Sequence, residues 1–143
     1  ISTSFDLRNL VLGSSPTNNK SEIDILIRVG FVGMEGVGKN VKAGIIYENF
    51  KAIDFQKYTF ELGYNFDGTR IIIQPSIEFG VIDRVVNYWT YGGNLDLIYY
   101  FKKRNFGIIL TSNISKATDL IAMWNEGKNW RYSNYVGLIY KFY

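Results

Sequence analysis

The sequence predicts an all-β fold, an eight-stranded antiparallel up-and-down β-barrel that crosses a membrane. Apolar and polar side chains alternate with a period of two along about eight segments, as expected for strands with two different faces. Within these segments the apolar face carries no charged residue, whereas the other face carries charges and about one glycine per segment. No run of 18 or more apolar residues occurs, so the sequence contains no candidate membrane helix.

The clearest pair of predicted strands flanks Asp67-Gly68. An Asp-Gly pair between two alternating runs predicts a two-residue hairpin turn, because both residues tolerate a positive φ. We therefore predict strands over 58–66 and 69–81. Pro75 has no N–H to give to the ladder, and its position within the second strand predicts a bulge.

The other strands follow from the same alternation. The eight predicted strands cover 3–11, 23–34, 41–50, 58–66, 69–81, 87–101, 106–115 and 130–143. Residues 117–125 allow a helical turn, extensions of the flanking strands or an ordered loop, and the ordered loop is the preferred interpretation. No repeat or linker divides the chain, so residues 1–143 are predicted to form a single domain.

The polar face is predicted to line the lumen, because the interior of an eight-stranded barrel is only wide enough for side chains to fill it. The bulky groups of the apolar face would overfill such a lumen, whereas charges and glycines fit it. Acidic and basic side chains inside a narrow lumen pair and plug it, since unpaired buried charge is costly. The predicted lumen charge network consists of Arg8, Arg28, Lys42, Glu48, Glu61, Arg70, Glu78, Asp96 and Lys141.

Aromatic side chains gather near the ends of the predicted strands, on the uncharged face. In barrels that cross membranes, such residues form girdles at the two interfaces. The connections after the second, fourth and sixth strands are also shorter than those after the first and seventh, as in outer-membrane barrels. The predicted lipid-facing girdle consists of Tyr58, Phe66, Trp89, Tyr99, Phe101, Phe106, Trp130, Tyr140 and Phe142.

The same alternation fits a second architecture, a soluble lipocalin-like barrel that keeps its apolar face inside and binds a small apolar ligand. That alternative predicts an apolar cavity and water-accessible Arg28, Glu61 and Glu78. The volume of the apolar side chains favours the membrane orientation over this alternative.

An alternating strand with aromatic residues at its end closes the chain, Tyr135-Val-Gly-Leu-Ile-Tyr-Lys-Phe-Tyr143. In strand count, alternation and this ending, the chain resembles the small eight-stranded outer-membrane β-barrels of Gram-negative bacteria, the OmpA and OmpX type. The resemblance implies an outer-membrane location with both termini periplasmic. It implies as partners outer-membrane lipid and lipopolysaccharide, the barrel-assembly machinery during insertion, and other envelope proteins.

The chain contains neither His nor Cys. The commonest general base and the usual ligands of transition metals are therefore missing, so we predict no enzymatic activity, no metal and no cofactor. A membrane enzyme that pairs Glu61 with Glu78 is a weaker alternative. The net charge of +3 is spread along the chain and indicates no nucleic-acid interface. The preferred hypothesis is a non-enzymatic outer-membrane barrel that acts as a scaffold, adhesion element or accessory subunit of an envelope complex.

Overall fold

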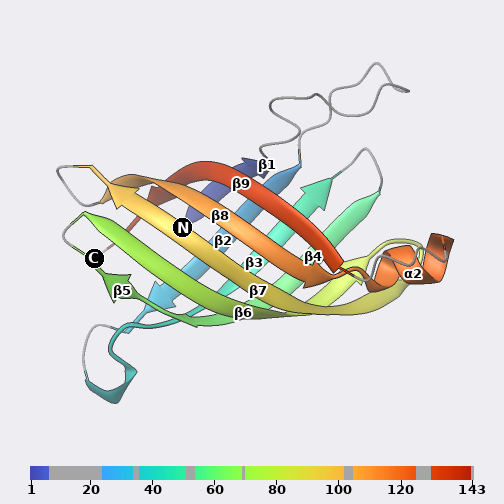
Figure 1. Ribbon diagram of the computed structural model, residues 1–143, viewed down its shortest axis with the longest axis horizontal. Helices are drawn as coiled ribbons and strands as arrows, with labels where there is room; N and C mark the ends of the chain where they lie inside the picture. Colours follow the sequence, from blue (N-terminus) through green and yellow to red (C-terminus); the bar gives the residue numbers. More distant parts are fainter. Residues whose placement is uncertain are drawn as a thin grey trace.

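The computed structural model describes residues 1–6, 24–33, 36–50, 54–68, 70–101, 105–124 and 130–142. Most of these residues belong to one antiparallel sheet that closes on itself (Figure 1). Its segments are β1 (Ser2–Asp6), β2 (Ile25–Val32), β3 (Val41–Phe50), β4 (Phe55–Tyr64), β5 (Phe66–Asp67), β6 (Ile71–Asp83), β7 (Asn87–Tyr100), β8 (Phe106–Lys116) and β9 (Trp130–Tyr140). The described part also contains a 3-10 turn, η1 (Gly36–Gly38), and a short helix, α2 (Thr118–Trp124).

Each strand pairs with its neighbours along the chain, and β1 pairs with β9 to close the ring. β4 and β5 both pair with β6 in one continuous register, so they are two parts of one strand that is interrupted at Asn65. The nine segments therefore form an eight-stranded antiparallel barrel. This architecture confirms the predicted all-β, eight-stranded fold.

The pairing register fixes the dimensions of the barrel. Followed in one direction from Ser2, paired residues lead to Thr90 on β7, and followed in the other direction they lead to Tyr100 on the same strand. The two paths are Ser2–Arg28–Ile46–Thr59–Gly80–Thr90 and Ser2–Ile139–Gly107–Tyr100. From residue 90 to residue 100 the stagger is ten residues. For eight strands, this stagger corresponds to a strand tilt of about 40° and a backbone radius of about 8 Å, which leaves room only for inward side chains.

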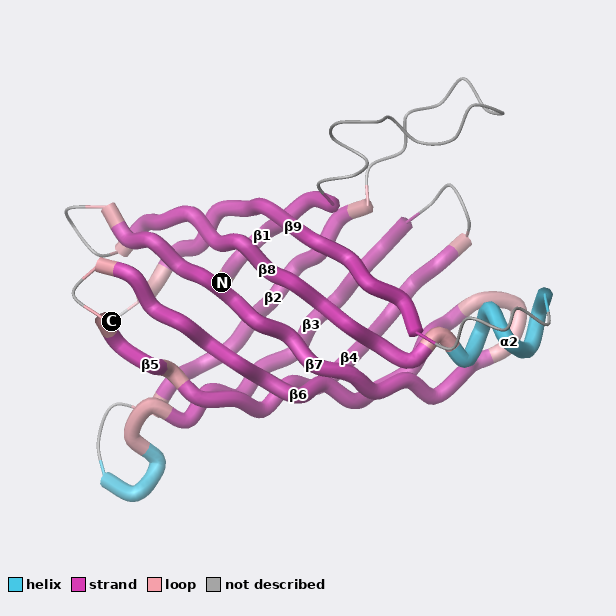
Figure 2. Tube along the Cα trace, viewed as in Figure 1, coloured by secondary structure: helices cyan, strands magenta, loops and turns pink. Residues whose placement is uncertain are grey.

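The barrel has two different ends (Figures 1 and 2). The short-turn end carries the connections after β2, β5 and β7, together with Ile1 and Phe142. The loop end carries the connections after β1, β3, β6 and β8, and α2 lies there. At the loop end, β6 and β7 are joined by residues 84–86 alone. The connections of the loop end are therefore not all longer than those of the short-turn end.

The hairpin turn lies two residues beyond its predicted position. The N–H of Gly68 donates to the carbonyl oxygen of Ile71 at 2.9 Å, so the chain reverses between these two residues. Asp67 pairs with Ile72 as part of the ladder. The long apolar faces set the register of the two strands, and a shift of two residues in the turn leaves each side chain on its predicted face.

Pro75 does not form the predicted bulge. It pairs with Leu95 in an unbroken register between β6 and β7. On its other side the pairing of β6 stops after Ser76 and resumes at Ile73, where β4 ends and β5 begins. A gap in the ladder, and not an inserted residue, therefore accommodates the missing N–H of the proline.

Several further element boundaries differ from the predictions. Residues 118–124 form α2, so the preferred ordered loop is wrong and the helical alternative is right. β6 runs to Asp83, two residues further than predicted, and β9 ends at Tyr140. β1 ends at Asp6 within the described residues, and the predicted continuation over 7–11 lies outside them.

Burial alternates along the strands, with polar side chains inside and apolar side chains outside. On β4, for example, Thr59 and Glu61 are buried, whereas Tyr58, Phe60 and Leu62 are exposed. The apolar face therefore points outward and the charged face points into the lumen, as the volume of the side chains predicts.

Glycines on the polar face are required by the neighbouring strands. A Cβ at Gly80 would collide with the carbonyl oxygen of Tyr58, and a Cβ at Gly137 would collide with that of Thr3. At these two positions the glycine allows the backbones of adjacent strands to approach closely.

Candidate functional site

Four charged side chains from four strands form a closed ring of ion pairs across the lumen, which we call the central ring. Arg28 lies 3.0 Å from Glu61 and 2.7 Å from Asp96, and Lys42 lies 3.1 Å from Glu61 and 2.9 Å from Asp96. Two cations and two anions thus balance, with 5% or less of each side chain exposed. Thr111 donates a further hydrogen bond to Asp96 at 2.7 Å. Because each carboxylate bridges two cations, the central ring plugs the lumen.

A second group of charges, the loop-side cluster, lies between the central ring and the loop end. Lys57 bridges Glu48 at 3.0 Å and Glu78 at 2.9 Å, and Arg131 forms an ion pair with Glu48. Tyr135 donates a hydrogen bond to Glu48 at 2.7 Å. Three further side chains donate hydrogen bonds to the carboxylate of Glu78: Asn113, Asn94 and Thr59.

Near the loop end of the lumen, a buried aromatic ring contacts two guanidinium groups. Phe55 is buried, with the Cζ of Arg131 4.0 Å and the Cζ of Arg84 5.3 Å from its ring centroid. Asp119 of α2 lies 2.7 Å from Arg84 and neutralises it. We call these four residues the loop-end seal. Cation–π contacts of this kind strengthen where water is excluded.

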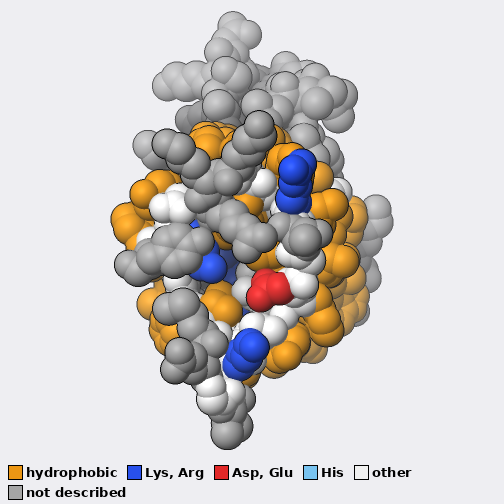
Figure 3. Space-filling view, turned by 90° about the vertical axis from the view of Figure 1, so that its left-hand side faces the viewer, with side chains coloured by type: hydrophobic (Ala, Val, Ile, Leu, Met, Phe, Trp, Pro, Cys, Tyr) orange, Lys and Arg blue, Asp and Glu red, His pale blue; other side chains and the backbone are white. Residues whose placement is uncertain are grey.

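The short-turn end is hollow by contrast. A cavity of about 570 Å³ opens there, which we call the end cavity. Figure 3, a view onto this end, shows hydrophobic side chains around the rim and Lys or Arg side chains toward the centre. The basic residues that line the end cavity are Arg28, Lys39, Lys42 and Lys141, and the acidic lining residue among those described is Asp67.

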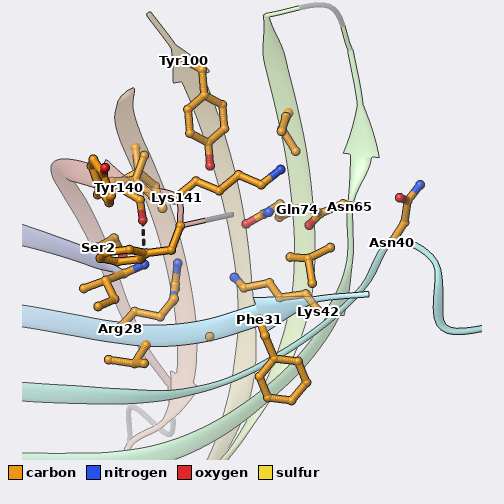
Figure 4. Close-up of a pocket in the computed structure, with 18 of the residues that line it drawn as sticks. Ser2, Arg28, Phe31, Asn40, Lys42, Asn65, Gln74, Tyr100, Tyr140 and Lys141 are labelled. Carbon is orange, nitrogen blue, oxygen red and sulfur yellow. Dashed lines mark hydrogen bonds between the residues drawn. The ribbon is translucent and has the colours of Figure 1, made fainter. Parts of the chain in front are cut away.

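Figure 4 shows Arg28, Lys42 and Lys141 projecting into the end cavity, with Lys141 reaching toward Gln74 on β6. Nη2 of Arg28 and Oδ1 of Asn65 are buried without a hydrogen-bond partner in the protein. Partial burial and the positive charge of Arg28 lower the pKa of the Ile1 ammonium. The end cavity is therefore electropositive and offers unused hydrogen-bonding groups.

Six of the nine predicted network residues lie in the two ion-pair groups: Arg28, Lys42, Glu48, Glu61, Glu78 and Asp96. Lys141 is half-buried and lines the end cavity instead. Arg70 is a correction: it is exposed next to the chain reversal before Ile71 and lies outside the lumen. Arg8 lies outside the described residues.

Sequence reasoning missed two charges of the loop-side cluster, Lys57 and Arg131. Both lie on the polar face by parity, Lys57 two residues before Thr59 and Arg131 two residues before Ser133. Lys57 lies one residue before its predicted strand, 58–66, so extending the parity by one residue would have found it. Arg131 lies within its predicted strand, 130–143, where the parity already places it on the polar face between Trp130 and Tyr132.

All nine predicted girdle residues are exposed on the outer face. Each takes part in a ring–ring contact, and the contacts fall into two groups. At the loop end the pairs are Tyr47–Tyr58, Phe79–Trp89 and Tyr91–Trp130. At the short-turn end they are Tyr64–Phe66, Tyr99–Phe101, Phe101–Phe106 and Tyr140–Phe142.

The lumen carboxylates are engaged by cations, amides and hydroxyls. Glu61 and Glu78 pair across β4 and β6, but each faces different partners: Glu61 binds Arg28 and Lys42, whereas Glu78 binds Lys57. In the described residues no three His, Cys, Asp or Glu side chains are grouped so that they could hold a metal ion. The arrangement is that of a charge-balanced plug.

No protein-family model, curated protein or solved structure matches the chain. Among the described residues, no helix has the length and apolar character needed to cross a membrane.

Proposed function

We propose that the protein is a non-enzymatic integral outer-membrane β-barrel with a plugged polar lumen, which acts as a scaffold, adhesion element or accessory subunit of an envelope complex. The observation that carries this proposal is the outer face of the barrel. Large apolar side chains are exposed around the strands. The apolar surface that they form extends far beyond the patch of a few hundred Å² that a soluble monomer exposes.

The height of this apolar face supports a bilayer as its surroundings. Trp130 and Tyr140, from the two groups of ring contacts, are ten residues apart on β9. At about 3.3 Å per residue and a tilt of about 40°, ten residues span about 25 Å. This is the height of the apolar band of outer-membrane barrels, which aromatic girdles flank on both sides. The exposed side chains between the two groups are largely aliphatic: Ile27, Val29, Ile45, Leu62, Ile73, Ile77, Leu95, Leu97, Ile108, Leu110 and Leu138.

The distribution of charge on the outer face supports the same proposal. Within the described strands, outward charged side chains are confined to Asp83 and Lys116, each the last residue of its strand at the loop end. Lys116 lies with its amine 5.3 Å from the ring centroid of Trp130. Long basic side chains beside interfacial aromatic rings are typical of the edge of a membrane-spanning segment.

The soluble carrier alternative requires the opposite orientation. Its ligand cavity would be apolar, and its charges would be accessible to water. The lumen instead contains buried Arg28, Glu61 and Glu78, while Phe60 and Leu62 are exposed. The observed faces therefore favour the membrane barrel.

The location and partners follow from the resemblance to the OmpA and OmpX type of barrel. Short turns and both chain ends face the periplasm in such barrels, so the loop end would lie outside the cell. The girdle residues would contact outer-membrane lipid and lipopolysaccharide, and the barrel-assembly machinery would insert the chain. Other envelope proteins are candidate partners of the loop end.

The proposal is tested by measuring how much of the variant Leu62→Arg inserts into lipid vesicles. The substituted side chain faces outward between the two aromatic girdles. An arginine near the bilayer midplane costs about 2–4 kcal/mol, so the folded fraction in vesicles should fall steeply, as measured by heat-modifiable gel mobility. The matched control is Asn87→Arg, at the loop end of β7, which should insert normally. A protein that remains monodisperse and folded without detergent or lipid would refute the proposal.

A further inference from the structure

Two polar side chains interrupt the apolar outer face of the barrel. Ser112 on β8 and Asn134 on β9 are cross-strand partners, and the hydroxyl of Ser112 donates to Oδ1 of Asn134 at 2.9 Å. The residues on either side of each are buried in the lumen, so both side chains point outward. Apart from Thr3 and the tyrosines, the other outward polar side chains of the described strands stand level with or beyond the loop-end ring contacts: Asn49, Gln56, Asp83, Asn87 and Lys116.

Asn134 lies deep within the apolar band. It is four residues from Trp130 and six from Tyr140 on β9, and these two residues belong to the two groups of ring contacts. At about 3.3 Å per residue and a tilt of about 40°, the carboxamide lies about 10 Å from one girdle and about 15 Å from the other. In the bilayer of the proposed function this is the hydrocarbon region, where no water is available to an amide.

The bond with Ser112 satisfies only part of the Asn134 carboxamide. A primary amide has two N–H donors and an oxygen with two lone pairs. Within the described part of the chain, Nδ2 of Asn134 donates no hydrogen bond. A polar group without a partner in hydrocarbon is costly, and such groups in membrane proteins are found paired or functional. The amide therefore calls for a partner from outside the barrel.

A glycine beside this polar pair is not required by the barrel itself. Gly93 on β7 faces outward and pairs with Ile114 on β8. A Cβ at Gly93 would meet the carbonyl oxygen of Ser76 at 3.4 Å, which is an ordinary contact. Gly80 and Gly137, by contrast, admit no Cβ. Because glycine weakens a strand, an outward glycine with free space around it is typical of a place where another chain approaches closely.

We propose that Gly93, Ser112 and Asn134, which we call the lateral patch, form the centre of an interface with a second copy of this chain, in which each Asn134 pairs with its counterpart. The inference rests on the proposed membrane location. Two copies inserted in the same direction are related by a two-fold axis along the membrane normal, so each residue meets its counterpart at equal depth. A carboxamide is donor and acceptor at once, so two Asn134 side chains exchange N–H···O bonds and satisfy each other.

The tilt of the strands confines this contact to a small area. Strands tilted by about 40° in each barrel cross those of the second copy at about 80° where the two walls touch. The contact is therefore centred on a crossing point, and the small side chains of the lateral patch let the walls approach there. Leu95, Ile114 and Tyr132 surround the patch and are roughly half exposed, so they pack around the crossing point.

Other occupants fit the lateral patch less well. Acyl chains would cover its apolar surroundings, but they have no group that accepts a hydrogen bond from Nδ2 of Asn134. A different envelope protein would have to present its own polar group at the same depth. A second copy supplies that group by symmetry, which is why the proposal commits to it.

Association is measured by resonance energy transfer in lipid vesicles that contain the full chain. The chain has no Cys, so a cysteine introduced at Asp54, exposed at the loop end, carries the donor or the acceptor dye. Energy transfer should rise with the protein-to-lipid ratio and fall when unlabelled chain is added. Asn134→Leu should weaken dimerisation roughly tenfold, because it removes the reciprocal hydrogen bonds. Gly93→Leu should weaken it by a similar factor, because the added side chain keeps the two walls apart.

Matched controls separate the lateral patch from the rest of the outer face. Asn87→Leu removes an outward amide on β7 that lies beyond the girdle, and it should leave dimerisation unchanged. Ala43→Leu adds bulk at a small outward residue on β3, the strand opposite β8 in the ring, and it should also have no effect. Asn134→Gln keeps the carboxamide and should restore most of the affinity. Heat-modifiable gel mobility shows for each variant that the barrel is folded and inserted.

The outcomes distinguish this inference from the proposed function. A chain that inserts but stays monomeric at every protein-to-lipid ratio would overturn the inference alone, whereas a chain that does not insert would overturn the proposed function. Unchanged dimerisation in Asn134→Leu and Gly93→Leu, or an equal loss in Ala43→Leu, would place the contact elsewhere and overturn the inference. So would a complex with another envelope protein that Asn134→Leu abolishes while the isolated chain stays monomeric.

Discussion

Near the loop end of the lumen, buried Phe55 contacts two guanidinium groups, whereas at the short-turn end a cavity of about 570 Å³ reaches down to the central ring. The backbone is the same closed barrel at both ends, so the difference comes from the inward side chains and how they pack. Inward residues near the loop end are large: Phe55, Lys57, Arg131 and Tyr135. The lining of the end cavity combines small residues, among them Ser2, Gly30 and Asn65, with larger ones, among them Ile72, Tyr100 and Lys141.

The comparison teaches that the radius of the barrel sets the space in the lumen, whereas the inward side chains decide how much of that space is filled. Where long side chains meet opposite charges, as in the loop-side cluster, several donors bind each carboxylate. Where the sequence provides small residues, buried polar atoms such as Oδ1 of Asn65 are left for water or a ligand. The loop end should therefore be sensitive to substitution and the short-turn end tolerant.

The largest expected effect is that of Asp96→Leu, which breaks the central ring at the boundary between the two regions. Arg28 and Lys42 would both lose a buried carboxylate, and unpairing a buried charge costs about 3–5 kcal/mol. We expect a loss of this size in the free energy of unfolding, measured by denaturant titration in detergent. The matched control is Asp67→Asn on the rim of the end cavity, which should change stability by less than about 0.5 kcal/mol. A loss below 1 kcal/mol for Asp96→Leu would contradict this view of the ring.

Phe55→Ala breaks the loop-end seal. Removal of a buried aromatic ring costs about 3 kcal/mol, and the guanidinium groups of Arg84 and Arg131 lose the face that they cover. Denaturant titration should show this loss, and Phe60→Ala on the outer face should show a smaller one. Equal effects of the two substitutions would mean that Phe55 contributes no more than an exposed ring.

Asp119→Asn tests the attachment of α2 to the barrel. Arg84 would keep a hydrogen-bond partner but lose the charge that neutralises it, so we expect a loss of about 2 kcal/mol. Amide exchange in α2 should accelerate, because the ion pair with Arg84 anchors the helix. Asp54→Asn, at an exposed acid of the same end, should affect neither measurement.

Asn65→Ala should have the smallest effect. The side-chain oxygen of Asn65 has no hydrogen-bond partner in the protein, and its backbone N–H still donates to the carbonyl oxygen of Asn40 in the variant. We expect a change within about 0.5 kcal/mol in the free energy of unfolding. A loss greater than about 1.5 kcal/mol would mean that the short-turn end is packed as tightly as the loop end.

Alternation along the chain was sufficient to predict the eight strands, the face that points inward and the four residues of the central ring. Parity decides which side of a strand a residue occupies, and the volume of the apolar groups decides which side is outside. Neither depends on where a turn falls, so the misplaced hairpin turn at Asp67-Gly68 did not disturb them. Parity alone also identifies Arg28, Lys42, Glu61 and Asp96 as lumen residues, but not which of them meet.

The contacts themselves could not be predicted, because they depend on the stagger of the barrel. Arg28 meets Asp96 across the lumen only because β2 and β7 face each other at that height. Likewise, α2 was missed because its position is fixed by Asp119 binding Arg84, a contact between segments 35 residues apart. The end cavity depends on how the inward side chains of several strands pack against one another, and alternation carries no signal for it.

The ion pairs that cross the lumen have a consequence for assembly. Arg28 on β2 and Lys42 on β3 both reach Asp96 on β7, and Glu48 on β3 reaches Arg131 on β9. None of these pairs joins adjacent strands, so a sheet that has curled only halfway leaves them apart. These pairs therefore form only when the ring closes, and a partly wound intermediate would hold Asp96 and Arg131 on its concave side without these ion-pair partners. The last hairpins to dock would thus close the wall and form these ion pairs in the same step.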